Sequence, residues 1–366
     1  MPDMNTKIEL KGEEKVIMAL RSLYTSYGYR PYKMSRFEEY DLYAGNKDFL
    51  VSGNVITFTD TDGKLMALKP DVTLSIVRSV RDVRNSVSRI CYDENVYRVS
   101  DRSGTFREIM QAGLECIGDV GLLELAEVAV LAQKSLTTIS EKSVLTISHM
   151  GIIEAFLKGI SSSEIAEEAI SALSSRNTQA ILSLQQKAPE ASDSLESLAH
   201  LCSMTGSNKE VLAELETMGA DSTSLKELKT VVSLLDPKVA RIDFTAVGGM
   251  KYYNGMVFRG YVEGVPAAVL SGGQYDRLLQ RMGRKSRAVG FAVYLDALER
   301  LLEDRREFDV DVVLLYDASA DIAQVLKRAR ALREGGMSVM VLRQVPEGLR
   351  YRDLVDLGTK RGGRDA

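Results

Sequence analysis

Apolar residues recur at helical spacing near the start of the chain. The segment Glu13–Tyr27 is therefore predicted to be an amphipathic helix, with Val16, Leu20 and Tyr24 on its apolar face. After it the pattern changes to short alternating runs bounded by turn residues, which is typical of strands. The predicted elements up to residue 150 are strands at Tyr29–Lys33, Val55–Thr59 and Lys64–Leu68, a helix at Asp71–Arg84, strands at Ser88–Val99 and Thr105–Ile117, a helix at Leu122–Ser140 and a strand at Val144–Ile147.

The two longest of these strands, Ser88–Val99 and Thr105–Ile117, are separated by a short polar segment. This segment, residues 100–104, contains charged residues and a glycine, as hairpin turns do. We therefore expect the two strands to pair as an antiparallel hairpin.

Strand signals vanish between about Gly151 and Asp236. Apolar residues recur there at helical spacing, and serine and glutamate dominate between them, which indicates short helices with polar caps. We interpret this region as an all-helical insertion. Its predicted helices are Ser163–Ser171, Gln179–Gln186, Ser192–Cys202, Lys209–Met218 and Ser224–Leu235.

Strand character returns after this region and continues to the C-terminal part. The predicted elements are strands at Ala240–Phe244, Gly255–Val262 and Ala267–Leu270, a helix at Tyr275–Met282, a strand at Ala288–Val293, a helix at Leu295–Glu303, a strand at Val310–Tyr316, a helix at Ala320–Arg333, a strand at Met337–Leu342 and a last helix near Tyr351–Leu357. The pattern predicts an α+β protein with an antiparallel sheet core and flanking helices, formed by residues 1–150 and 237–305. The helical insertion, 151–236, interrupts this core, and a short α/β module, 308–366, follows it.

Composition narrows the classes of function. The net charge is −4 and the pI about 5.6, which argues against nucleic acid as a partner because phosphate neutralisation needs a basic surface. No apolar stretch approaches the roughly 20 residues of a membrane span, and the N-terminal residues lack the apolar region of a signal peptide. Three cysteines without a C-x-x-C pair indicate reduced thiols, and two histidines exclude a histidine-rich metal site. We expect a cytoplasmic protein that contacts no membrane and holds no metal or cofactor.

Polar residues interrupt one face of the strand that ends near Ile117. Because side chains alternate along a strand, Gln111, Gly113 and Glu115 share a face. The glycine is predicted to leave a hollow into which both long polar side chains can lean. The same pattern also fits a solvent-facing strand with unrelated polar residues. Arg98 would lie near this hollow across the hairpin, or would form a surface ion pair with Glu108 or Asp101.

Five blocks of the sequence resemble the class II aminoacyl-tRNA synthetases in their histidyl form. The blocks occur in the order of that family and span about residues 8–305, so together they are far more specific than any one of them. The matching blocks are Leu68–Thr73, Val96–Glu115 (the family's motif 2), Lys251–Phe258 (its tyrosine pair), Ser271–Asp276 (its glycine-rich strand) and Ala288–Val293 (its motif 3 strand).

The resemblance implies a binding site for histidine. The corresponding residues of the family surround the amino acid, and here they are Asp71, Thr73, Gln111, Glu115, Tyr252 and Tyr253, with Arg98 near the carboxylate. The chemistry fits, because carboxylate and hydroxyl oxygens accept hydrogen bonds from an ammonium group. An imidazole both donates and accepts, so a carboxylate and a tyrosine hydroxyl can orient it. For the adjacent tyrosines, an ordinary core position remains open for one of the two.

The residues that would handle ATP depart from the family's pattern. Gly248 stands where the family has a catalytic arginine, and Ala297 replaces the arginine that contacts the ATP phosphates. Ser100 replaces the glutamate that reads adenine, and Ser35 replaces the proline of motif 1. Each lost phosphate-binding cation removes on the order of a hundredfold in rate from a reaction whose transition state builds up negative charge. No catalytic residue is therefore expected.

This selective loss resembles the synthetase-like regulatory subunits of ATP phosphoribosyltransferase, the first enzyme of histidine biosynthesis. The resemblance implies a non-catalytic subunit that dimerises, binds a short-form catalytic ATP phosphoribosyltransferase subunit and conveys feedback inhibition by histidine. A divergent histidyl-tRNA synthetase is the alternative. A free-standing relative that acts on another substrate, or senses uncharged tRNA, is a third possibility, which the acidic charge and short C-terminal module do not favour.

Overall fold

The structure of the chain is a computed structural model that describes residues 11–46, 49–50, 55–81, 85–99, 104–247, 253–302 and 307–358. It divides into two compact units. The larger unit comprises residues 13–302, and the smaller one contains the described residues 307–358. Among the described residues, none of the helices combines the length and the apolar content that a membrane span requires.

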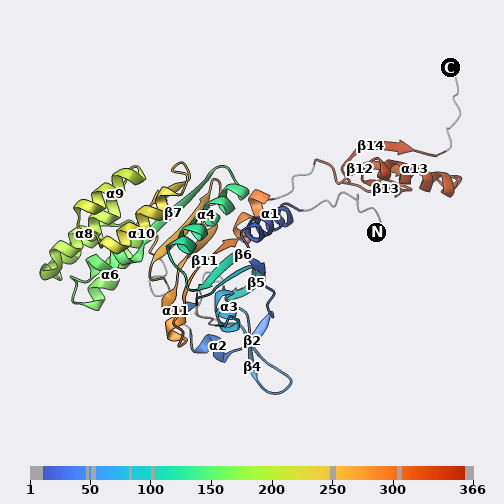
Figure 1. Cartoon of the computed structure of the whole chain (residues 1–366). Coiled ribbons are helices and arrows are strands. Elements are labelled where there is room, and N and C mark those ends of the chain that lie inside the picture. Colours follow the sequence, from blue (N-terminus) through green and yellow to red (C-terminus); the bar gives the residue numbers. More distant parts are fainter. Residues whose placement is uncertain are drawn as a thin grey trace. The chain divides into compact units, whose positions relative to one another are not determined.

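An eight-stranded sheet forms the centre of the larger unit (Figure 1). Its strands, in spatial order, are β1 (Arg30–Pro31), β5 (Val87–Val99), β6 (Phe106–Gly118), β11 (Arg287–Tyr294), β10 (Leu270–Gln274), β9 (Met256–Val262), β7 (Ser143–His149) and β8 (Ala240–Ile242). Neighbours pair antiparallel except at the two ends of the sheet, where β1–β5 and β7–β8 are parallel. The predicted hairpin is confirmed, because β5 and β6 pair along their whole length.

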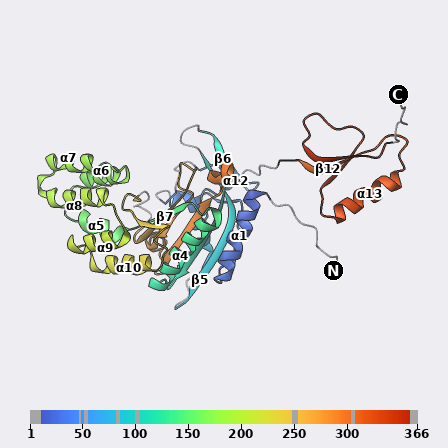
Figure 2. The ribbon, with the colours of Figure 1, turned by 90° about the horizontal axis from the view of Figure 1, so that it is seen from above.

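Helices cover both faces of this sheet. Figure 1 shows α1 (Gly12–Ser26) and α4 (Leu122–Ile139) on one side, with α3 (Thr73–Ser79) and α11 (Asp276–Arg281) on the other. On the α1/α4 side, Leu114 and its apolar neighbours on β6 join the main hydrophobic core, and Figure 2 shows these two helices running alongside the strands. A second, smaller core lies on the opposite side, beneath α3 and α11.

Between β7 and β8 the chain forms helices only, as the apolar pattern predicts. They are α5 (Met150–Leu157), α6 (Ser163–Ser174), α7 (Thr178–Ser183), α8 (Ser192–Ser203), α9 (Asn208–Thr217) and α10 (Ser222–Ser233). Several begin at a polar cap: Ser162, Asn177, Ser207 and Asp221 each accept a hydrogen bond from a backbone N–H of the following helix. Their apolar faces extend the main core.

A three-stranded antiparallel sheet lies beside the N-terminal part of the larger unit, in the order β2 (Phe37–Glu39), β4 (Leu65–Leu68), β3 (Thr57–Thr59). The strands β3 and β4 are predicted, whereas β2 and the short helix α2 (Asp41–Ala44) are not. These two elements are too short to develop a periodic pattern of their own.

The position of β10 differs from its prediction at Ala267–Leu270, because the strand continues through Gly272 and Gly273. Glycines weaken the strand signal in a sequence. Here, pairing with β9 on one side and β11 on the other holds them in the sheet. The helix expected at Asp71–Arg84 spans Thr73–Ser79, and Arg84 lies outside the described residues.

The smaller unit is a parallel sheet in the order β13 (Val339–Leu342), β12 (Val310–Leu315), β14 (Tyr351–Asp356), with α13 (Ile322–Glu334) packed by Val325 and Ala329. The prediction of a helix at Tyr351–Leu357 is wrong, because this segment is the strand β14. Tyr351 and Val355, its less exposed residues, are four positions apart, a spacing that fits one helical turn as well as two strand repeats. Parallel pairing with β12 decides the outcome.

Candidate functional site

Strand register gathers the predicted polar residues on one face of the large sheet. Residues paired across a sheet point to the same side, so Gln111 lies beside Tyr294 of β11, and Glu115 lies beside Gly290. Gly113 pairs with Ala292 on one side and with Tyr92 of β5 on the other. Small residues thus form a floor between larger polar side chains. This face is not solvent-exposed, because Gln111 and Glu115 are 3% and 2% exposed.

Glu115 is held by two hydroxyl groups. The Thr73 hydroxyl donates to Oε1 at 2.7 Å, and the Tyr275 hydroxyl donates to Oε2 at 2.5 Å. Burial raises the pKa of the Glu115 carboxyl to about 8, although both hydroxyls oppose that rise. The carboxylate also lies directly over Gly290, where any side chain would collide with it. A glycine at this position is therefore a condition for the placement of Glu115.

Asp71 lies at the start of α3 and is buried. Its Oδ1 accepts a hydrogen bond from the Leu74 N–H at 2.8 Å, which satisfies one of the unpaired amides of the first helical turn. Burial raises the pKa of Asp71, whereas the hydrogen bond from Leu74 and the nearby charge of Arg98 lower it. The Nε of Arg98 donates to the Pro70 carbonyl at 3.0 Å. The alternative of an ion pair with Glu108 is wrong, because the Glu108 carboxylate accepts from other side chains, those of Asn95 and Tyr97. Asp101 lies outside the described residues.

The hollow predicted above Gly113 is filled. A Cβ added to Gly113 would lie 2.5 Å from the Tyr92 hydroxyl, so the tip of the Tyr92 ring occupies that space. The prediction was wrong because it considered β6 alone, whereas register places a large aromatic residue of β5 directly opposite the glycine. Gln111 and Glu115 therefore flank a tyrosine and not an open space.

Gln111 carries an unsatisfied polar atom. Its Nε2 is buried and has no hydrogen-bond partner among the described residues. Buried donors are nearly always paired in folded proteins, so this one requires an acceptor beyond the described residues, such as water or a ligand. A ligand with an acceptor group would supply that partner.

Two tyrosines and a serine complete the face. Tyr253 packs against Gly273, where an added Cβ would lie 2.9 Å from its ring. Burial raises the pKa of both Tyr253 and Tyr294, and a hydrogen bond with the Ser271 side chain partly opposes the rise at each. Tyr252, the other predicted tyrosine, lies outside the described residues, as do Gly248 and Ser100.

Sequence reasoning did not name Tyr275, Ser271 or Tyr294 as site residues. Tyr294 had a recognisable signal, because it follows Ala292 by two positions on a strand and so shares its face. Ser271 likewise alternates with Gly273 on β10. Tyr275 gave no such signal, because it follows the end of β10 and reaches Glu115 only through the fold.

Ala297, after the end of β11, stands at the position of the family's phosphate-contacting arginine. Ala297 lies in a short 3-10 helix, η4 (Asp296–Leu298), and packs against the main core. Arg107, on the neighbouring strand, is mostly exposed and approaches Asp296 at 3.9 Å. Among the described residues, no group of three or more side chains is arranged to hold a metal ion.

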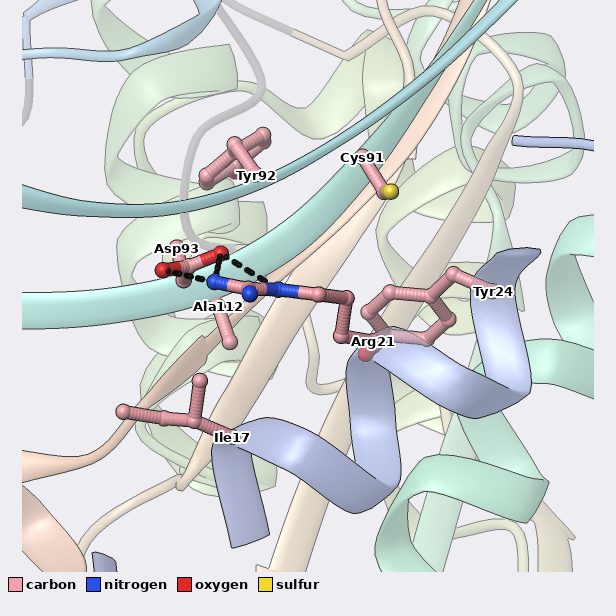
Figure 3. A pocket seen from close by; sticks show the side chains of 7 residues that line it. All are labelled: Ile17, Arg21, Tyr24, Cys91, Tyr92, Asp93 and Ala112. Carbon is pink, nitrogen blue, oxygen red and sulfur yellow. Dashed lines mark hydrogen bonds and ion pairs between the residues drawn. The ribbon is translucent and has the colours of Figure 1, made fainter. Parts of the chain in front are cut away.

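A small cavity on the opposite face of the sheet is unsuited to an amino acid (Figure 3). It lies between α1 and strands β5 and β6, and Arg21 closes one side of it through its ion pair with Asp93 at 2.6 Å. Its volume of about 10 Å³ accommodates roughly one water molecule. In Figure 3 the Tyr92 ring lies on the other side of the β5 ribbon from Arg21.

Comparison with known proteins assigns the family. The family model described as Histidyl-tRNA synthetase matches residues 6–298. The chain belongs to the histidyl-tRNA synthetase family. The predicted class II synthetase-like fold is thereby confirmed, and solved structures agree. A protein of Bacillus halodurans described as an ATP phosphoribosyltransferase regulatory subunit/histidyl-tRNA synthetase is similar with a TM-score of 0.77 and 22% identity, over 98% of both chains.

Two further proteins that are similar to this chain have names that refer to ATP phosphoribosyltransferase. The chain is 28% identical to the ATP phosphoribosyltransferase regulatory subunit of Clostridium kluyveri over 90% of its own length and 88% of the relative's. A chain of the ATP phosphoribosyl transferase complex of Thermotoga maritima is similar with a TM-score of 0.62 and 22% identity, over 77% of this chain and 97% of that one.

Proposed function

We propose that this protein is the non-catalytic regulatory subunit of ATP phosphoribosyltransferase, and that it conveys feedback inhibition by histidine. The observation that carries the proposal is an asymmetry within the synthetase fold. Among the groups suited to a free amino acid, Gln111 and Glu115 are buried on one face of β6, and the half-buried Thr73 of α3 donates to Glu115. The two arginine positions of the ATP site hold Gly248 and Ala297. The names of its relatives support the same function.

The histidine would bind between α3 and the polar face of the sheet. Asp71 receives the ammonium group, and Glu115 and Tyr253 orient the imidazole. A charge-assisted hydrogen bond from the imidazole to Glu115 compensates for the burial of that carboxylate. Arg98 contributes a positive charge beside Asp71, which favours the ionised form of that carboxyl. Tyr252 belongs to the proposed site by resemblance.

Inhibition then follows from thermodynamic linkage. The protein would dimerise through its synthetase-like core and bind the short-form catalytic subunit, and the resulting assembly is active. Histidine shifts this assembly towards an inactive state by binding that state more tightly. The coupling is reciprocal, so substrates that favour the active state must weaken histidine binding. The protein would act in the cytoplasm, a location that its three free, buried cysteines fit.

The first experiment is calorimetric titration of the isolated protein with histidine. We expect saturable binding by the wild type and none by the Gln111→Ala, Glu115→Ala double variant. Glu108→Ala is the matched control, because Glu108 is an exposed carboxylate of the same strand on the opposite face. Unchanged affinity in the double variant would refute the site.

The second experiment tests the partner. The protein is mixed with a short catalytic ATP phosphoribosyltransferase subunit, and co-elution and phosphoribosyltransferase activity are measured with and without histidine. We expect association, activation and inhibition by histidine. Histidine-dependent pyrophosphate exchange by the protein alone would instead establish the divergent synthetase and overturn the regulatory function.

A further inference from the structure

A buried ion pair lies where strand β4 leads into the segment that carries Asp71. The ammonium group of Lys69 donates to Oε2 of Glu94 at 2.9 Å, and the Lys69 side chain is completely buried. Glu94 is buried as well, and its other carboxylate oxygen accepts a hydrogen bond from the Met34 N–H at 3.1 Å. Both charges are therefore removed from water and satisfied within the protein.

The Glu94 carboxylate belongs to the polar face of the large sheet. Glu94 pairs with Gln111 across the β5–β6 hairpin, and residues paired across a sheet point to the same side. Arg98, four residues further along β5, shares this face, and its Nε donates to the Pro70 carbonyl at 3.0 Å. The stretch that follows β4 is therefore anchored to the same face as Gln111 and Glu115.

This stretch, from Lys69 to Asp71, is stiff. The Lys69 carbonyl accepts a hydrogen bond from the Tyr97 N–H at 2.8 Å. Pro70 has a fixed φ and no N–H of its own, and a residue that precedes a proline is restricted to extended conformations. The three residues consequently shift as a unit, so an ion pair that fixes the Lys69 side chain also fixes the place of Asp71.

Stability does not explain why this ion pair is present. Moving two charges out of water costs free energy that their attraction roughly repays, and apolar side chains of similar volume can often replace a buried ion pair without loss of stability. What a buried pair can provide is one defined geometry. Here that geometry belongs to the stretch that carries the acceptor proposed for an ammonium group.

We propose that Lys69 and Glu94 are positioning residues that hold Asp71 in place for the ammonium group of the bound amino acid. This inference rests on the proposed histidine site and adds to it two residues that contact no ligand. Lys69 also neutralises Glu94, which is a second carboxylate on the same face as Gln111. Glu94 therefore does not compete with Asp71 for the ammonium group.

The test compares two ligands by calorimetry on the full-length protein. Imidazolepropionate lacks the ammonium group of histidine and is otherwise the same. We expect wild type to prefer histidine by about 10- to 100-fold, the contribution of a charge-assisted hydrogen bond. The double variant Lys69→Met, Glu94→Leu should bind histidine roughly 10-fold more weakly and should bind imidazolepropionate within about threefold of wild type. Its midpoint of unfolding in urea should be unchanged or higher.

The double variant Arg21→Met, Asp93→Leu is the matched control. It removes another ion pair of β5, at the residue before Glu94 and on the opposite face of the strand. Both ligand affinities of this control should stay within about threefold of wild type. The single variant Lys69→Met leaves the Glu94 carboxylate buried without its cation, so its unfolding midpoint should fall well below that of the double variant.

Several outcomes would overturn the inference. Equal weakening of both ligands by Lys69→Met, Glu94→Leu would mean that the pair supports the whole site and not Asp71 in particular. Unchanged binding of both would mean that Asp71 keeps its place without the pair. A lower unfolding midpoint, or failure to fold, would mean that the pair is present for stability. All three results leave the histidine site intact, whereas failure of the wild type to bind either ligand would refute the proposed function, and this inference with it.

Discussion

The two faces of the β5–β6 hairpin are made of alternate residues of the same strands, yet they are built on different principles. On the α1/α4 face, Leu114 and Cys116 are completely buried in an apolar core. On the other face, Gln111 and Glu115 are almost as deeply buried, and one has an unpaired amide while the other has a strongly raised pKa. Burial of such groups costs stability, so the first face holds the fold together, and we propose that the second is maintained for a ligand.

The largest effect is expected from breaking the apolar face. Leu114→Ala removes a fully buried side chain and should lower the free energy of unfolding by about 2–5 kcal/mol. Urea unfolding measures this change. Histidine affinity of the folded variant should change by less than about threefold, and a loss of binding at full folding would contradict the division between the faces.

Glu115→Gln, at the next residue of the strand, should have the opposite effect: histidine affinity should fall, and the free energy of unfolding should not. It removes the carboxyl group proposed to receive the imidazole. At pH 9, where this carboxyl is ionised, the substitution should weaken histidine binding by roughly 10- to 100-fold, because a hydrogen bond to a charged group contributes about 1.5–3 kcal/mol. Stability at neutral pH should not fall as it does in Leu114→Ala. Calorimetry and urea unfolding on the same preparation check both parts.

The pH dependence of stability sharpens the comparison further. The folded-state pKa of Glu115, about 8, lies above the ordinary value of 4.5, so the folded protein holds this proton more tightly than the unfolded chain. The resulting stabilisation is complete below about pH 4.5 and is lost as the pH rises through about 8. Wild type should therefore lose stability relative to Glu115→Gln by up to roughly 1.4 kcal/mol per pH unit across that interval. The free energy of unfolding of both proteins is measured from pH 5 to 9. A constant difference between the two values over this range would contradict the raised pKa of Glu115.

The smallest effect is expected at the rim of the apolar face. Arg21 pairs with Asp93 through two oxygens, at 2.6 and 2.7 Å, but its side chain is half exposed. Arg21→Met should lower the free energy of unfolding by less than about 1 kcal/mol and leave histidine binding unchanged. A larger decrease in the free energy of unfolding would show that the residues around the cavity of Figure 3 contribute more to stability than an exposed ion pair does.

Periodicity predicted the parts of the fold that local pattern decides. The helix α1, the long hairpin and the helices between β7 and β8 follow from spacing and caps visible in the sequence. The segment 351–357 does not, because its spacing suits either a helix or a strand and only pairing with β12 selects the strand. The displacement of β10 has the same origin, since its glycines become a strand through two neighbours distant in the chain.

The candidate site shows a similar limit. The resemblance named Asp71, Thr73, Gln111 and Glu115. The structure brings Asp71 and Thr73 to Glu115, and Gln111 lies buried on the same face of β6 as Glu115. It did not reveal that Tyr92 fills the space above Gly113, because strand register is a property of two segments. The contribution of Tyr275 to Glu115 depends on a pair separated by 160 residues, which no local pattern contains.

The two hydroxyl groups that hold Glu115 fix its carboxylate before any partner arrives. Thr73 donates to one oxygen and Tyr275 to the other, and each oxygen keeps a further lone pair that can accept. The histidine that we propose would therefore meet an acceptor whose orientation is already set, and little side-chain entropy would be lost when it binds. Selectivity at this position would then come from rigidity, at little cost in affinity.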